Sequence, residues 1–131
     1  MDLKNLKLPE KKTITPRDFF GKLFQIRDEV HLAHLGTKSY AQHIALGDFY
    51  DGILDLTDSI IEQYQGKYGL IDIKIPEAKK PSDACECIKS LAKLTDGGSV
   101  YNMFKETWIQ NKLDEISSLC YQTLYKLENL K

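Results

Sequence analysis

Hydrophobic residues recur at helical spacing in four stretches of this chain. Two long stretches come first, over residues 16–35 and 39–65; a shorter one covers 82–95, and a last long one covers 100–129. Apolar residues three and four positions apart lie on one face of an α-helix. The pattern therefore predicts three long amphipathic helices and one short helix.

Local signals set the expected ends of these helices. Thr15 and Pro16 suit the start of the first helix, because a threonine oxygen caps backbone N–H groups and proline lacks the N–H that would be unpaired there. Gly36 and Gly66 are expected to end the first and second helices. The Asp-Gly-Gly run at 96–98 is expected to end the third.

The segment from 67 to 81 has a different pattern. β-branched and polar residues alternate there between glycine and proline, but the segment stands alone and predicts an extended crossover rather than a sheet. A short first loop makes antiparallel neighbours, whereas a long link lets the second pair of helices enter from the far end. The expected fold is all-α: a ferritin-like four-helix bundle with a long second connection and a shortened third helix.

Length and charge refine this picture. The chain has 131 residues, 42% of them apolar, and a net charge of −1, which predicts one domain over residues 16–131. Residues 1–15 lack periodicity and are interpreted as a basic tail, because residues 1–17 carry five basic and two acidic side chains. No long apolar window and no apolar leader is present, so we expect a cytoplasmic protein without a membrane span.

The cysteines favour no cross-link or metal cluster. There are three, Cys85, Cys87 and Cys120, and the first two are separated by one residue. A disulfide framework pairs an even number of cysteines, and a zinc knuckle spaces them by two residues. We therefore interpret all three as core or incidental thiols.

The second predicted helix carries an unusual number of acids, opposed only by Lys38. On a helical wheel, most of them lie beside the apolar face within an arc of about 100° that also holds His43. His31 and His34 lie on the first helix, next to Arg27, which is expected to pair with Asp58 or another of these acids. The five acids are Asp48, Asp51, Asp55, Asp58 and Glu62.

Two interpretations of this acidic stripe are open. Carboxylates and imidazoles on facing helices suit iron, manganese or zinc, and oxygen donors match the harder ions. Alternatively, the stripe is a solvated face and the histidines are hydrogen-bonded packing residues.

The spacing resembles that of the Dps family of mini-ferritins, the starvation-type DNA-protection proteins. The resemblance covers residues 17–66 and, more loosely, the last helix. In that family a histidine near the end of the first helix is followed by a glycine five residues on, a second histidine twelve on, an aspartate twenty-seven on and a glutamate thirty-one on. Here those positions are His31, Gly36, His43, Asp58 and Glu62.

The resemblance implies an iron site between two subunits. His31 and His43 would come from one chain, and Asp58 and Glu62 from the other. Family members form hollow dodecamers that bind and oxidise Fe(II) as ferroxidases and store the ferric mineral. Many bind DNA through a lysine-bearing tail, and the similar lysines here are Lys4, Lys7, Lys11 and Lys12.

The chain also departs from that pattern. Gly47 stands where the family has a ligating aspartate, so Asp51, one turn further along the stripe, is the candidate substitute ligand. The aromatic-asparagine pair after the first histidine is Leu32-Ala33 here. With its short third helix, the chain is similar to uncharacterised ferritin-like proteins carried by bacteriophages, which implies a phage-infected cell or a virion as its location.

Two alternatives to the shared iron site remain. A metal site inside one chain would use the acid-x-x-His pair Asp28 and His31, with acids of the last helix facing Asp51 or Asp55; those acids are Glu106, Asp114 and Glu115. A metal-free binding or structural module would instead use its polar seam for assembly, for a small ligand or for a host factor. Both the ferroxidase and the module are expected to be homo-oligomers.

Overall fold

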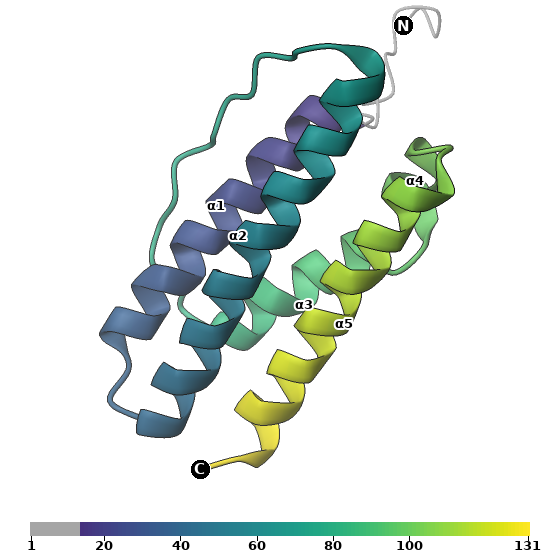
Figure 1. Cartoon of the computed structure of the whole chain (residues 1–131). Helices are drawn as coiled ribbons and strands as arrows, with labels where there is room; N and C mark the ends of the chain where they lie inside the picture. The colour runs from purple at the N-terminus through teal and green to yellow at the C-terminus, as the bar shows by residue number, and fades with distance from the viewer. Residues whose placement is uncertain (1–13) are drawn as a thin grey trace, which may run out of the picture.

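The computed structural model describes residues 14–131 and contains five α-helices joined around one core (Figure 1). Among these residues there is no strand, so the all-α prediction is confirmed. Residues 1–13, which hold most of the basic tail, lie outside the described part of the chain. The helices are α1 (Pro16–Gly36), α2 (Tyr40–Tyr68), α3 (Ala84–Thr95), α4 (Gly98–Met103) and α5 (Thr107–Asn129).

Four of the helices pack around the core in a ring, in the order α1, α2, α5, α3. α1 and α5 each contact both α2 and α3. The connection over residues 69–83 runs back along α1 to the end at which α2 begins, so α2 and α3 point the same way (Figure 1). The predicted crossover is thus present. It forms no helix and no strand, and its isoleucines Ile71 and Ile73 pack against the core.

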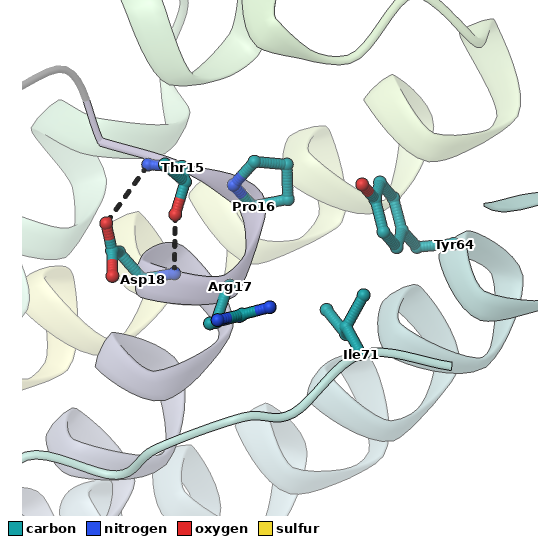
Figure 2. A pocket seen from close by; sticks show the side chains of 6 residues that line it. All are labelled: Thr15, Pro16, Arg17, Asp18, Tyr64 and Ile71. Carbon is teal, nitrogen blue, oxygen red and sulfur yellow. Dashed lines mark hydrogen bonds between the residues drawn. The ribbon is translucent and has the colours of Figure 1, made fainter. Parts of the chain in front are cut away.

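The start of α1 follows its local signals. The Asp18 backbone N–H donates to Thr15 Oγ1 at 3.2 Å, and the Thr15 N–H donates to Asp18 Oδ2 at 3.3 Å (Figure 2). Pro16 occupies the first helical turn. This capping box satisfies two N–H groups that the helix leaves unpaired, and losing such a cap typically costs about 1 kcal/mol.

The end of α2 differs from the prediction. The helix passes through Gly66 and ends at Gly69, whose φ of +93° lies in the left-handed region that favours glycine. The Gly69 N–H donates to the Gln65 carbonyl at 2.8 Å and closes the last turn. Gly66 is therefore an interior residue, because only the second glycine adopts the terminating conformation.

The prediction of one helix over residues 100–129 is wrong. The chain leaves helical geometry at Phe104, which is extended and only 1% exposed, and regains it at Thr107. The break turns the Phe104 ring into the core, where it stacks on Phe20 at 6.0 Å between centroids. Gln110 Nε2 donates to the freed Phe104 carbonyl at 2.8 Å. Burial of the aromatic ring outweighs the helical periodicity of the sequence.

A buried acid joins this break to the end of α2. The Glu106 side chain is 5% exposed, and its Oε2 accepts hydrogen bonds from the Tyr68 hydroxyl and from Lys67 Nζ, the latter at 3.2 Å. The hydrogen bond from Tyr68, followed by the one from Lys67, holds the pKa of Glu106 below its usual range. The charged carboxylate therefore ties α5 to α2.

Replacing Glu106 with glutamine tests this tie. Because the folded pKa is depressed, the stabilisation is present above pH 4.5, the ordinary value for glutamate, and is lost as the pH falls through the folded pKa. We expect Glu106→Gln to lower the melting temperature at pH 7, with the difference from the parent protein shrinking as the pH falls below 4.5. Thermal unfolding followed by circular dichroism over a pH series measures this, with Asp114→Asn as a solvent-exposed control. An equal loss at every pH would contradict the assignment.

Candidate functional site

Two histidines join the end of α1 to the start of α2. His43 Nδ1 lies 2.9 Å from the His34 carbonyl oxygen, and His34 Nδ1 in turn contacts the His43 carbonyl oxygen at a shorter distance. Their rings stack with 3.7 Å between centroids and 20° between planes. Since a carbonyl only accepts, each Nδ1 is the hydrogen-bond donor in this contact.

The stack continues along the interface of α1 and α2. The His31 ring lies 4.1 Å from the Tyr50 ring, centroid to centroid, at 20°. The Arg27 guanidinium carbon lies 5.6 Å from the centroid of the same tyrosine ring. We call these five residues, Arg27, His31, His34, His43 and Tyr50, the histidine seam. All five side chains are only partly buried, so the seam reaches the surface.

Gly47 makes room for this arrangement. A Cβ added there would lie 3.0 Å from His34 Cε1 and 3.2 Å from His34 Nδ1, closer than ordinary van der Waals contact. The position at which the resemblance expected a ligating aspartate is thus covered by an imidazole ring. Glycine at 47 is explained by packing.

The acids of α2 point elsewhere. Asp51, Asp55, Asp58 and Glu62 are all exposed, and none forms a salt bridge within residues 14–131. The remaining acid of the stripe, Asp48, lies 3.8 Å from Lys126 Nζ on α5. The stripe is therefore a solvent-facing surface of the described chain.

One chain does not bring the predicted ligands together. His31 and His43 lie in the histidine seam, whereas Asp51, Asp58 and Glu62 lie on the exposed face of α2. Across residues 14–131, no group of three or more histidine, cysteine, aspartate or glutamate side chains is placed to hold a metal ion. The residues of a single chain do not fit an iron ion, and the site shared between subunits stays a prediction.

Two further expectations change. Arg27 donates from Nη1 to Asp28 Oδ1 at 3.2 Å rather than to an acid of α2. The alternative site inside one chain loses Glu106, which is bound to Lys67 and Tyr68 at the far end of α2. The four lysines proposed to bind DNA lie within residues 1–13, outside the described part of the chain.

The structure adds two hollows that the sequence did not indicate. A cavity of about 460 Å³ lies at the start of α1, where the Tyr64 and Ile71 side chains face Pro16 and Arg17 (Figure 2). A groove of about 330 Å³ lies at the other end, between the start of α2 and the end of α5. Its lining is Tyr40, Ala41, Ile44, Ala45, Asp48, Lys126, Leu130 and Lys131. Residues from distant segments form both hollows, so neither has a signal in local sequence.

The fold and these sites define a small all-helical protein whose histidines pack an interhelical interface. A protein family described as "Family of unknown function (DUF5856)" matches residues 34–127. An uncharacterised 14.6 kDa protein of Enterobacteria phage T4, from the mobD-ri intergenic region, is 34% identical over 112 residues, which are 84% of this chain and 85% of that protein. The chain belongs to this family of unknown function.

These comparisons correct the resemblance to Dps mini-ferritins. The family that matches is not the Dps family, and its match covers the region that holds His43, Asp58 and Glu62. No solved structure matches the chain. None of the helices in the described part of the chain has the length and hydrophobicity that a membrane crossing requires.

Substitution of Gly47 tests the packing of the seam. We expect Gly47→Leu to displace the His34 ring and to lower the free energy of unfolding by about 1–3 kcal/mol, the usual range for overpacking. Urea unfolding measures the change. The matched control is Gly66→Leu in the same helix, because nothing lies within 4 Å of an added Cβ at that position. There we expect a gain of up to about 1 kcal/mol, from higher helix propensity. Equal effects at both glycines would contradict the proposed packing.

The thiols are expected to be unreactive. All three are free; burial raises the pKa of Cys87 to about 11 and that of Cys120 to about 12. At pH 8 only about a thousandth of the Cys87 side chains, or fewer, is thiolate, the reactive form. We expect a disulfide reagent such as DTNB to modify Cys85 first and Cys120 last, far more slowly than in urea-unfolded protein. Fast modification of Cys120 in the folded protein would refute this order.

Proposed function

We propose that the protein is a non-catalytic helical module that assembles with further copies of itself in a phage-infected cell or in a virion. The observation that carries this proposal is the groove between α2 and α5. Its three large apolar side chains, Tyr40, Ile44 and Leu130, are 79%, 45% and 51% exposed. A contiguous apolar surface of this kind on a small protein is typical of an interaction site.

Charges around the groove favour a second copy as the occupant. Lys126 and Lys131 lie at its α5 side, and Asp48 lies at its α2 side, with Asp51 and Asp55 following along the exposed face. A two-fold pairing presents the same patch from both copies, so lysines of one copy can meet acids of the other. The contact of Lys126 with Asp48 inside one chain is long and exposed, which makes it weak.

The histidine seam has a structural role in this proposal. His43 precedes Ile44 in α2, and its hydrogen bond to the His34 carbonyl fastens the first turns of α2 to α1. The side chains of Tyr40 and Ile44 are therefore presented from a fixed backbone. A pre-ordered surface loses less entropy on binding than a flexible one.

The same proposal treats the four packed helices as a ferritin-like four-helix bundle with a shortened third helix. Two features support this topology: α1 and α5 each pack on α2 and α3, and the link from α2 to α3 spans the length of α1. The fold class alone does not assign a function.

A metal site shared between copies is the second candidate function. One observation favours it: His43 donates Nδ1–H to a backbone carbonyl, which is the usual orientation of a histidine that binds metal through Nε2. In the shared site, His31 and His43 would come from one copy, and the exposed acids Asp58 and Glu62 from the other, with Asp51 as a candidate fifth ligand. Oxygen and imidazole donors of this kind suit iron or another divalent metal, and bound iron would supply Fe(II) oxidation.

Sedimentation equilibrium of the purified protein tests self-assembly. We expect a dimer or larger oligomer, and a rise of at least about tenfold in the dissociation constant for Ile44→Glu, because a buried charge in an apolar contact is strongly unfavourable. Leu32→Glu is the matched control, since Leu32 is 40% exposed on α1 and does not line the groove. A parent protein that stays monomeric up to about 0.5 mM would overturn the proposal.

Anaerobic titration with Fe(II), followed by air or peroxide, tests the second candidate. If the shared site exists, the oligomer binds iron, and the double variant His31→Ala/Glu62→Ala loses both binding and oxidation. A matched control is Asp114→Ala, an exposed acid on α5. Absence of binding, or unchanged oxidation in the double variant, would remove the metal from consideration.

A further inference from the structure

We propose that residues 70–75 of the crossover form a strand edge that pairs, antiparallel, with the same residues of a second copy. This inference rests on the proposed self-assembly but uses a surface separate from the groove. The segment runs along the outside of α1 in Figure 1.

The backbone of this segment has unused hydrogen-bonding groups. From Asp72 to Ile75, no N–H or C=O group forms a hydrogen bond within residues 14–131. The Lys74 carbonyl oxygen is turned against Gly21 of α1, so the groups left for a partner strand are those of the opposite edge, at Ile73 and Ile75. A row of unpaired backbone groups on an extended segment is a template for another strand.

From Leu70 to Lys74 the side chains alternate as they do in a strand, and the alternation ends at Ile75, which is 53% exposed. Ile71 and Ile73 pack against the core, whereas Asp72 and Lys74 are exposed. The inward isoleucines fix which face of the segment points to solvent. The alternation therefore gives the segment a defined orientation without any partner strand.

The fold also holds the segment in place before any pairing. The Lys74 carbonyl oxygen lies directly against Gly21 of α1, so close that no side chain larger than hydrogen fits there. Ile71 N–H donates to Gln65 Oε1 at 3.1 Å, and Gln25 Nε2 donates to the Glu77 carbonyl at 3.0 Å. An edge that is already ordered loses little conformational entropy when it pairs.

Charge selects both the partner and the register. In an antiparallel pair centred on Ile73, Asp72 of each copy lies opposite Lys74 of the other, which gives two opposite-charge pairs related by symmetry. A shift of the pairing by one residue places Asp72 and Lys74 opposite isoleucines of the other copy. Centring on Asp72 or on Lys74 instead places like charges together. Neither residue has an ion-pair partner within residues 14–131.

Apolar exposure supports the same surface. Leu70 is 90% exposed, the largest value among the big apolar side chains of the described chain, and Ile75 is 53% exposed. Two strands by themselves are only marginally stable in water, so pairing also requires apolar cover. Both side chains border the proposed pair and gain cover when a second copy binds.

Charge reversal combined with sedimentation equilibrium tests the inference. We expect Asp72→Lys and Lys74→Asp each to raise the dissociation constant about tenfold or more, because each places like charges opposite one another. The double variant Asp72→Lys/Lys74→Asp restores the opposite pairs and should return to within about twofold of the parent value. Asp114→Lys, on the exposed face of α5, controls for net charge and should leave association unchanged.

The outcomes separate this inference from the proposed function. A parent protein that is always monomeric overturns both. An oligomer that is weakened by Ile44→Glu but not by either single charge reversal overturns the strand pairing and leaves the groove interface standing. Single reversals that weaken association without rescue in the double variant overturn the proposed register.

Discussion

The reciprocal contact between His34 and His43 fixes how α1 and α2 lie against each other. Each ring donates to the backbone carbonyl of the other residue, and the rings stack face to face at 3.7 Å. Because the two residues flank the turn, this contact sets the rotation of α2 about its own axis. The acids Asp51, Asp58 and Glu62 consequently face solvent, and Tyr40 and Ile44 line the groove.

Local chemistry made the starts of the helices predictable, and tertiary packing made the breaks unpredictable. Thr15 caps α1 as its sequence indicates, because the capping box involves only neighbouring residues. Gly66 and Gly69 look equally able to end a helix, and only the backbone conformation distinguishes them. Phe104 follows the periodicity of a helix, yet the chain bends there to bury its ring among aromatics that lie far away in sequence.

In the candidate site too, the residue types could be read from the sequence, but their packing could not. The residue types and spacings of His31, His43, Asp58 and Glu62 are all present in the sequence, but spacing does not say which side chains face each other. Two histidines nine residues apart across a short turn can cap each other's carbonyls. Gly47 was the sequence signal for this packing, since the missing side chain leaves space for His34. The groove is formed by segments that lie far apart in the sequence, and the crossover edge depends on exposed backbone groups. Helical periodicity encodes neither.

The crossover also shapes the order in which the chain can fold. α1 and α2 are joined by residues 37–39 alone, so their contacts form between neighbours in the sequence. α5 reaches α2 only across the crossover and α3, and that packing closes a much longer loop. Loop closure loses more entropy as the loop lengthens, and contacts between distant residues slow folding. The hairpin of α1 and α2 is therefore the part of the molecule able to assemble first, with its paired histidines holding the two helices together.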